Sequence, residues 1–136
     1  MIVADTDVLV DYLRGASPGA ERVAIELATG RFATTCVTAF ELLAGGRSSR
    51  QSRAVDDLLD ALDVLPLDMP SVRAAASVRR FLDAGGQGIG MADSLIAGIC
   101  IASRAMLLTR NRQHFERVEG LALATLSLSD RESPPS

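Results

Sequence analysis

The sequence predicts an α/β fold, a three-layer α/β/α sandwich in which helices cover both faces of a mostly parallel central sheet. Short apolar runs typical of buried strands alternate along the chain with segments whose apolar residues recur at helical spacing. Hydrophobic residues make up 48% of the chain and aromatic residues only 4%, which is typical of a core filled by Ala, Leu and Val. A chain of 136 residues is the size of one domain and is long enough to bury a substantial core.

The first half of the chain contains two expected strands and four expected helices. Ile2–Ala4 is a short apolar run suited to a strand buried on both faces, and FATTCV at 32–37 is β-branched enough for a second strand. The helices are expected from Asp7, over 20–28, from Thr38 and over 48–62.

The second half repeats the alternation. Pro66 favours an edge strand at 64–67, because proline cannot donate to the hydrogen-bond ladder of a central strand. Gly98 costs its expected helix about 1 kcal/mol of propensity against alanine, so we expect close packing on a neighbour there. The remaining elements are helices over 70–82 and 91–103, a strand over 105–109, a helical turn over 111–117 and a strand over 121–128. We expect a single domain over 1–130 and a disordered tail over 131–136.

Composition excludes several classes of protein and site. The net charge of −3 leaves no broad basic field of the kind that nucleic-acid binding proteins often carry. Cys36 and Cys100 stand far apart and the chain has one histidine, so a zinc site lacks ligands. Both cysteines are expected to be small apolar residues in a reducing cytoplasm. No signal peptide is recognisable, and the longest apolar run, at 95–102, is too short to span a membrane.

Acidic residues lie at or soon after the expected strand ends and at the start of the apolar helix. These acids are Asp5, Glu41 and Asp93, and Thr109, Arg110 and Asn111 follow the fourth strand. Because the carboxyl ends of parallel strands meet at one edge of a sheet, this is where a ligand crevice is expected. Each acid also has a structural alternative: Asp5 as a helix cap, Glu41 in a Thr38-x-x-Glu41 capping box, and Asp93 beside a helix dipole.

Three gathered carboxylates repel one another, and their pKa values rise unless a cation compensates. An all-oxygen donor set without cysteine or histidine is typical of Mg²⁺ or Mn²⁺. Such an ion polarises a phosphoryl oxygen and activates water for phosphodiester hydrolysis, so the sequence indicates a metal-dependent hydrolase.

Four segments together resemble the PIN-domain ribonucleases, and within them the VapC-type toxins of bacterial toxin–antitoxin pairs. They are IVADTDVLVDYLRG, VTAFELLAG, GIGMADSLIAGICIA and LLTRNRQHFERV, in the family's order and spacing. The resemblance implies that Asp5, Glu41 and Asp93 bind the metal and that Thr6 and Thr109 are the hydroxyls beside them. It also implies a PIN-like sandwich, Mg²⁺-dependent (or Mn²⁺-dependent) endonuclease action on RNA, a homodimer and a small VapB-like antitoxin.

The chain departs from that family after the fourth strand. Many relatives carry a fourth acid where this chain has Asn111, so occupancy of a second metal site is open, and a PIN-like module that binds RNA or a partner with little or no cleavage is the alternative function. His114 stands where relatives often have aspartate, and as a lone histidine in a surface turn it is expected to be structural or idle.

Two further hypotheses concern partners. Arg110 and Arg112 are expected near the mouth of the site, where they would hold RNA phosphates. An antitoxin segment is expected to contact the helices around Leu9, Tyr12, Leu42 and Leu58. The motif after the first strand also resembles haloacid-dehalogenase-type phosphatases, and receiver domains likewise cluster acids at strand ends. Both rely on a lysine, however, and this chain has none.

Overall fold

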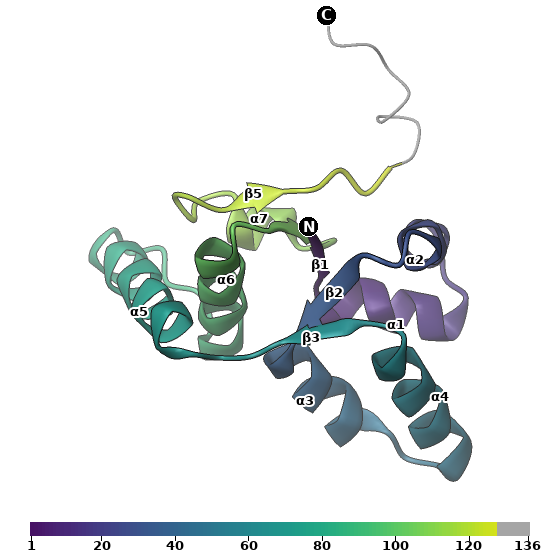
Figure 1. Ribbon diagram of the computed structural model, residues 1–136. Helices are drawn as coiled ribbons and strands as arrows, with labels where there is room; N and C mark the ends of the chain where they lie inside the picture. Colours follow the sequence, from purple (N-terminus) through teal and green to yellow (C-terminus); the bar gives the residue numbers. More distant parts are fainter. Residues whose placement is uncertain (128–136) are drawn as a thin grey trace, which may run out of the picture.

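Residues 1–127, the part of the chain that the computed structural model describes, contain a five-stranded sheet in the order β3-β2-β1-β4-β5 (Figure 1). Every neighbouring pair of these strands is parallel, which confirms the predicted sheet. The strands are β1 (Ile2–Ala4), β2 (Phe32–Thr35), β3 (Asp63–Leu65), β4 (Met106–Leu108) and β5 (Ala122–Leu123). The predicted tail over 131–136, and the end of the last predicted strand at residue 128, lie outside the described residues.

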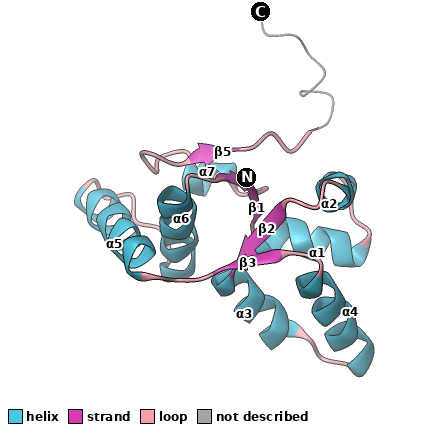
Figure 2. Ribbon diagram, in the orientation of Figure 1, coloured by secondary structure: helices cyan, strands magenta, loops and turns pink. Residues whose placement is uncertain are grey.

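Helices form a layer on each face of the sheet, as Figure 2 shows. One layer contains α1 (Thr6–Arg14), α2 (Gly19–Ala28), α3 (Cys36–Gly45) and α4 (Ser49–Asp60). The other contains α5 (Met69–Ala84), α6 (Met91–Ser103) and the single turn α7 (Arg112–Phe115). The predicted α/β/α sandwich is therefore confirmed.

Strands β1 and β4 are apolar throughout because each of their faces meets a helical layer. Val3 and Leu107 pack into the core beneath α5 and α6, whereas the next residues along, Ala4 and Leu108, pack into the core beneath α1 to α4. All four side chains are fully buried. A strand buried on both faces has no polar alternation, which is why IVA and MLL were recognisable as short apolar runs.

The register of the sheet aligns the ends of its three central strands. Ala4 pairs with Thr34 on β2 and with Leu108 on β4. The residue after Ala4, Asp5, donates its backbone N–H to Leu108 O at 2.9 Å. The positions that follow these strands therefore start from the same level of the sheet, which is where the sequence predicted a ligand crevice.

The second strand is shorter than predicted, and the helix after it begins earlier. Thr35 Oγ1 accepts a 3.1 Å hydrogen bond from the backbone N–H of Thr38, so Thr35 is the N-cap and α3 starts at Cys36. The predicted Thr38-x-x-Glu41 capping box is wrong for this reason, since Thr38 already lies inside the helix. Glu41 is consequently not needed as a cap.

Close packing at Gly98 is confirmed. A Cβ atom at this position of α6 would lie 2.5 Å from Ser71 O and 2.6 Å from Ala75 Cβ, both on α5. Only glycine lets the two helix backbones approach this closely, and the contact pins α5 and α6 together beneath the sheet.

The cysteines differ in burial. Cys100 is fully buried, as predicted, whereas Cys36 at the start of α3 is partly exposed. Burial raises the pKa of the Cys100 thiol to about 12, so it stays protonated. Within residues 1–127 no helix is long and apolar enough to cross a membrane.

Candidate functional site

Asp5 lies at the centre of the site, between the end of β1 and the start of α1. Its Oδ1 accepts a 2.8 Å hydrogen bond from the backbone N–H of Thr6, and its Oδ2 accepts a 2.7 Å bond from the hydroxyl of Thr109. Asp5 therefore caps α1 with one carboxylate oxygen and binds the residue after β4 with the other, so the predicted helix cap leaves its predicted role in the site open. Only 6% of the residue is exposed.

Burial raises the pKa of Asp5 from 3.8 to about 6. The hydrogen bond from Thr109 opposes the shift, while the negative charges of Asp7 and, less strongly, Asp93 add to it. A buried carboxylate whose pKa is raised in this way lacks a nearby positive charge that would compensate its own negative charge.

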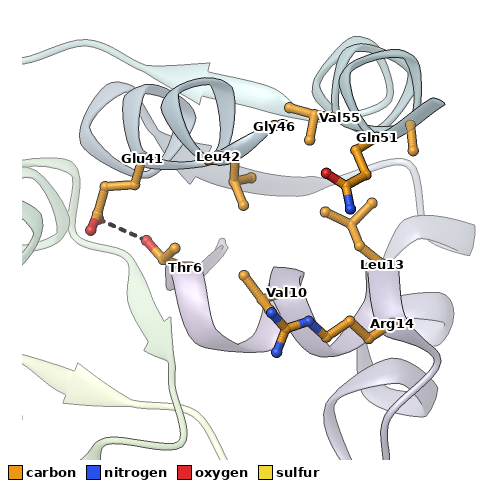
Figure 3. A pocket seen from close by; sticks show the side chains of 11 residues that line it. Thr6, Val10, Leu13, Arg14, Glu41, Leu42, Gly46, Gln51 and Val55 are labelled. Carbon is orange, nitrogen blue, oxygen red and sulfur yellow. Dashed lines mark hydrogen bonds between the residues drawn. The ribbon is translucent and has the colours of Figure 1, made fainter. Parts of the chain in front are cut away.

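Glu41 on α3 is linked to Asp5 through Thr6, which forms hydrogen bonds with both residues. Thr6 donates its hydroxyl to Glu41 Oε1 at 2.9 Å (Figure 3). The Thr38 hydroxyl lies 3.1 Å from that of Thr6. The Glu41 side chain is exposed, so Thr6 holds it at the rim of the site. The structure thus brings Asp5, Thr6 and Glu41 together, as the sequence predicted.

Asp93 is in the first turn of α6, which has Gly90 as its N-cap and no side-chain cap. The nearest polar partner that it shows is His114, whose Nδ1 lies 3.4 Å from Asp93 Oδ2. Because the charge of Asp93 raises the pKa of Asp5, the two carboxylates are within electrostatic range of each other.

The loop after β4 completes the site. Thr109 is fully buried, and the backbone N–H of Asn111 donates to its hydroxyl at 3.0 Å. Asn111 itself is the exposed N-cap position of α7, and its side chain makes no capping hydrogen bond. The amide at the position of the missing fourth acid is therefore free to face solvent or a ligand.

Asp7 belongs to this loop contact, although it was not among the predicted site residues. Its Oδ2 accepts a 3.0 Å hydrogen bond from the backbone N–H of Arg110 and lies 3.4 Å from the Thr109 hydroxyl. Its Oδ1 is buried without a hydrogen-bond partner among the described residues. Burial raises the pKa of Asp7 as well. The signal that pointed to it was its position two residues after Asp5, at the same strand-to-helix junction.

Both arginines predicted at the mouth of the site bond to the protein itself. Arg110 Nε forms a 2.9 Å ion pair with Oδ2 of the buried Asp11 on α1, and Arg112 Nη1 donates to Ala124 O at 2.8 Å. These bonds fasten the loop after β4 to α1 and to the end of β5. A contact of either guanidinium with RNA phosphate stays a prediction.

The donor chemistry of the site fits a hard divalent cation. Carboxylate, hydroxyl and amide oxygens are the ligands such ions prefer, and the raised pKa of Asp5 and the orphaned Asp7 Oδ1 mark a place that positive charge would stabilise. Among residues 1–127, no three carboxylate, histidine or cysteine side chains already converge at ligating distance. Each acid is instead held by its own neighbour, Glu41 by Thr6 and Asp93 by His114.

A cleft of about 290 Å³ leads away from the Thr6–Glu41 pair, between α1, α3 and α4. Figure 3 shows Val10, Leu42 and Val55 on its walls, with Arg14 at the end far from Glu41. Leu42, on one of the helices predicted to meet an antitoxin, lines this cleft although it is only 5% exposed. Leu9 and Leu58 are 0% and 4% exposed and belong to the core, so contact of an antitoxin with the helices around them stays a prediction.

Comparisons with known proteins show the family and the fold of the chain. Residues 2–121 match the profile of the family described as PIN domain. The chain is 31% identical to Ribonuclease VapC10 of Mycobacterium tuberculosis (strain ATCC 25618 / H37Rv), over 89% of this chain and 90% of that protein. It is 27% identical to the tRNA(fMet)-specific endonuclease VapC of Shigella flexneri, over 86% and 91%. Its fold matches a chain of the DNA-bound VapBC crystal structure from Salmonella typhimurium with a TM-score of 0.81, at 24% identity and over 93% and 98% of the two chains.

Proposed function

Since the chain belongs to the PIN-domain family, we propose that it is a divalent-metal-dependent endoribonuclease and the toxin of a toxin–antitoxin pair. The observation that carries the proposal is the hydroxyl-linked arrangement of acids at the ends of the central strands. Thr109 binds Asp5, Thr6 binds Glu41, and Asp93 lies within electrostatic range of Asp5.

Asp5 and Asp93 are the residues proposed to hold the cation, Mg²⁺ or Mn²⁺, with Glu41 beside them. When bound there, such an ion polarises a phosphoryl oxygen and lowers the pKa of water, which makes phosphodiester hydrolysis possible at neutral pH.

The chain's own groups prepare this chemistry. Thr109 and the Thr6 amide each occupy one oxygen of Asp5, so its carboxylate cannot rotate freely. Thr6 positions Glu41 from the other side. Burial of Asp5 excludes water around it and strengthens its attraction for positive charge, because electrostatic interactions increase as the local dielectric constant falls.

Cleavage of RNA in Mg²⁺ and in EDTA tests the proposal. The parent protein should cut RNA in Mg²⁺ and stop when EDTA removes the ion, and Asp93→Asn should fold normally but lose cleavage. Folded protein that binds RNA without cutting it in Mg²⁺ or Mn²⁺ would instead support a binding module. If the parent and Asp93→Asn cut RNA equally fast, Asp93 is not part of the active site.

We propose that the cleft beside the Thr6–Glu41 pair receives an apolar segment of a small VapB-like antitoxin. Its walls are largely apolar and it ends at the proposed active site, so an occupant would obstruct access to the acids. Ala54 is an exposed residue of the lining. Ala54→Arg should therefore keep RNA cleavage and growth arrest but lose rescue by the co-expressed antitoxin. The matched control is Ala102→Arg, at an exposed position of α6 in the other helical layer, which should still be rescued.

We further propose a homodimer and a cytoplasmic location. Phe40 and Leu43 lie one turn apart on α3, and 70% and 54% of their surfaces are exposed, an apolar pair suited to an interface between two copies. Phe40→Asp should then shift the sedimentation coefficient from that of a dimer to that of a monomer. The cytoplasm is proposed because both cysteines are free thiols.

A further inference from the structure

His114 lies beside the acids although the sequence predicted a structural or idle role. It belongs to α7, and the next residue, Phe115, is fully buried and anchors this single turn in the core beneath the sheet. The His114 ring nitrogen Nδ1 is 3.4 Å from Asp93 Oδ2 on α6. The His114 side chain is 54% exposed and that of Asp93 27%, so an ion from solvent can reach both side chains.

The two atoms make at most a long hydrogen bond and lie close enough to become ligands of one cation. A well-formed N–H···O hydrogen bond spans about 2.7–3.2 Å, and the observed 3.4 Å is longer. Two adjacent ligands of an octahedral ion, each about 2.1 Å from it, lie about 3 Å apart. A small movement of either exposed side chain would satisfy this spacing.

We propose that the His114 imidazole is a ligand of the cation bound at Asp93 and makes the site prefer Mn²⁺ to Mg²⁺. The inference rests on the proposed function, since it concerns the same cation. Mg²⁺ favours oxygen ligands almost entirely, whereas transition metals accept an imidazole nitrogen readily. One nitrogen among the oxygens of Asp5, Asp93 and Asn111 therefore shifts selectivity away from Mg²⁺.

The chain offers an unusually clean spectroscopic test because His114 is its only histidine. Electron spin echo envelope modulation of Mn²⁺ bound to tag-free, full-length protein should contain the ¹⁴N signal of a coordinated imidazole. That signal should vanish in His114→Gln. Calorimetric titration should show Mn²⁺ binding weakened about tenfold in this variant, with Mg²⁺ binding changed by less than about twofold.

Gln113→Ala, one residue earlier on the same exposed turn, is the matched control and should keep both the signal and the affinities. Bound Mn²⁺ without the ¹⁴N signal, or a signal that persists in His114→Gln, overturns the role of His114 while RNA cleavage stands. A clear signal in protein that cuts no RNA overturns the nuclease function and leaves the ligand assignment. If the parent protein does not bind Mn²⁺, both the ligand assignment of His114 and the metal-dependent nuclease function are overturned.

Discussion

Thr109 donates a 2.7 Å hydrogen bond to Asp5 across 104 residues of sequence. The bond joins the end of β4 to the end of β1, and it is fully enclosed because both residues are buried. It stabilises the ionised form of Asp5, whereas burial opposes ionisation and prevails, since the pKa of Asp5 rises to about 6. The site therefore contains a carboxylate whose negative charge the surrounding protein only partly compensates.

The raised pKa of Asp5 predicts that the metal-free protein loses stability as pH rises. A carboxyl group whose pKa is 3.8 unfolded and about 6 folded holds its proton more tightly in the folded state. Its contribution is present below pH 4 and is lost as pH rises through 6, by about 3 kcal/mol in total. Urea denaturation in EDTA between pH 4 and 7.5 measures this. Asp5→Asn should flatten the curve relative to the parent, and parallel curves would contradict the shift.

Divalent cations should restore the stability that the metal-free protein loses at neutral pH. An ion that binds only the folded state adds about 2.7 kcal/mol to the free energy of unfolding at 100 times its dissociation constant. Thermal or urea unfolding with Mg²⁺ or Mn²⁺ against EDTA measures the gain. Asp93→Asn should reduce the response without unfolding the protein, and an unchanged response would place the ion elsewhere.

Removal of the Thr109 hydroxyl should destabilise the protein and raise the pKa of Asp5 further. Thr109→Val keeps the shape but leaves Asp5 Oδ2 without its donor and the Asn111 N–H without its acceptor, at a cost of about 1–3 kcal/mol. Thr109→Ser retains the hydroxyl and is the control. Urea denaturation of the three proteins at pH 7 checks this, and equal losses in both variants would point to packing instead.

Asn111 should contribute to metal binding less than a primary ligand does. Its backbone N–H supports Thr109 whatever the side chain, so substitutions here isolate the exposed amide. Asn111→Asp adds a negative charge, worth about 1 kcal/mol or more at short range, and should lower the Mg²⁺ concentration for half-maximal cleavage. Asn111→Ala should cost less activity than Asp5→Ala. If the two alanine variants are equally inactive, Asn111 is a full member of the site.

Gly98→Ala should destabilise the protein although alanine is the better helix former. The added Cβ would meet Ser71 O and Ala75 at 2.5 and 2.6 Å, and overpacking of this kind costs about 1–3 kcal/mol. At Gly45, the last residue of α3, a Cβ meets nothing within 4 Å. Gly45→Ala should thus be neutral or stabilise by up to about 1 kcal/mol. Thermal unfolding of both variants checks the contrast, and a stable Gly98→Ala would mean that α5 and α6 can separate.

The sequence by itself determined the layers of the fold and the level at which the site lies. Ile2–Ala4 lies between two helical layers, so it must be apolar throughout, and this composition was visible without the structure. Because parallel strands end at one edge, the residues after them were expected to meet there, and Asp5 and Thr109 do.

Only the tertiary structure decided which side chains bind one another at that edge. Local sequence favoured Thr38 as the cap of α3, but Thr35 holds that role because β2 ends there. The ion pair of Arg110 with Asp11 and the approach of His114 to Asp93 join residues far apart in sequence. Such contacts depend on strand register and on how helices pack, which are set by the whole core, so no local pattern could predict them.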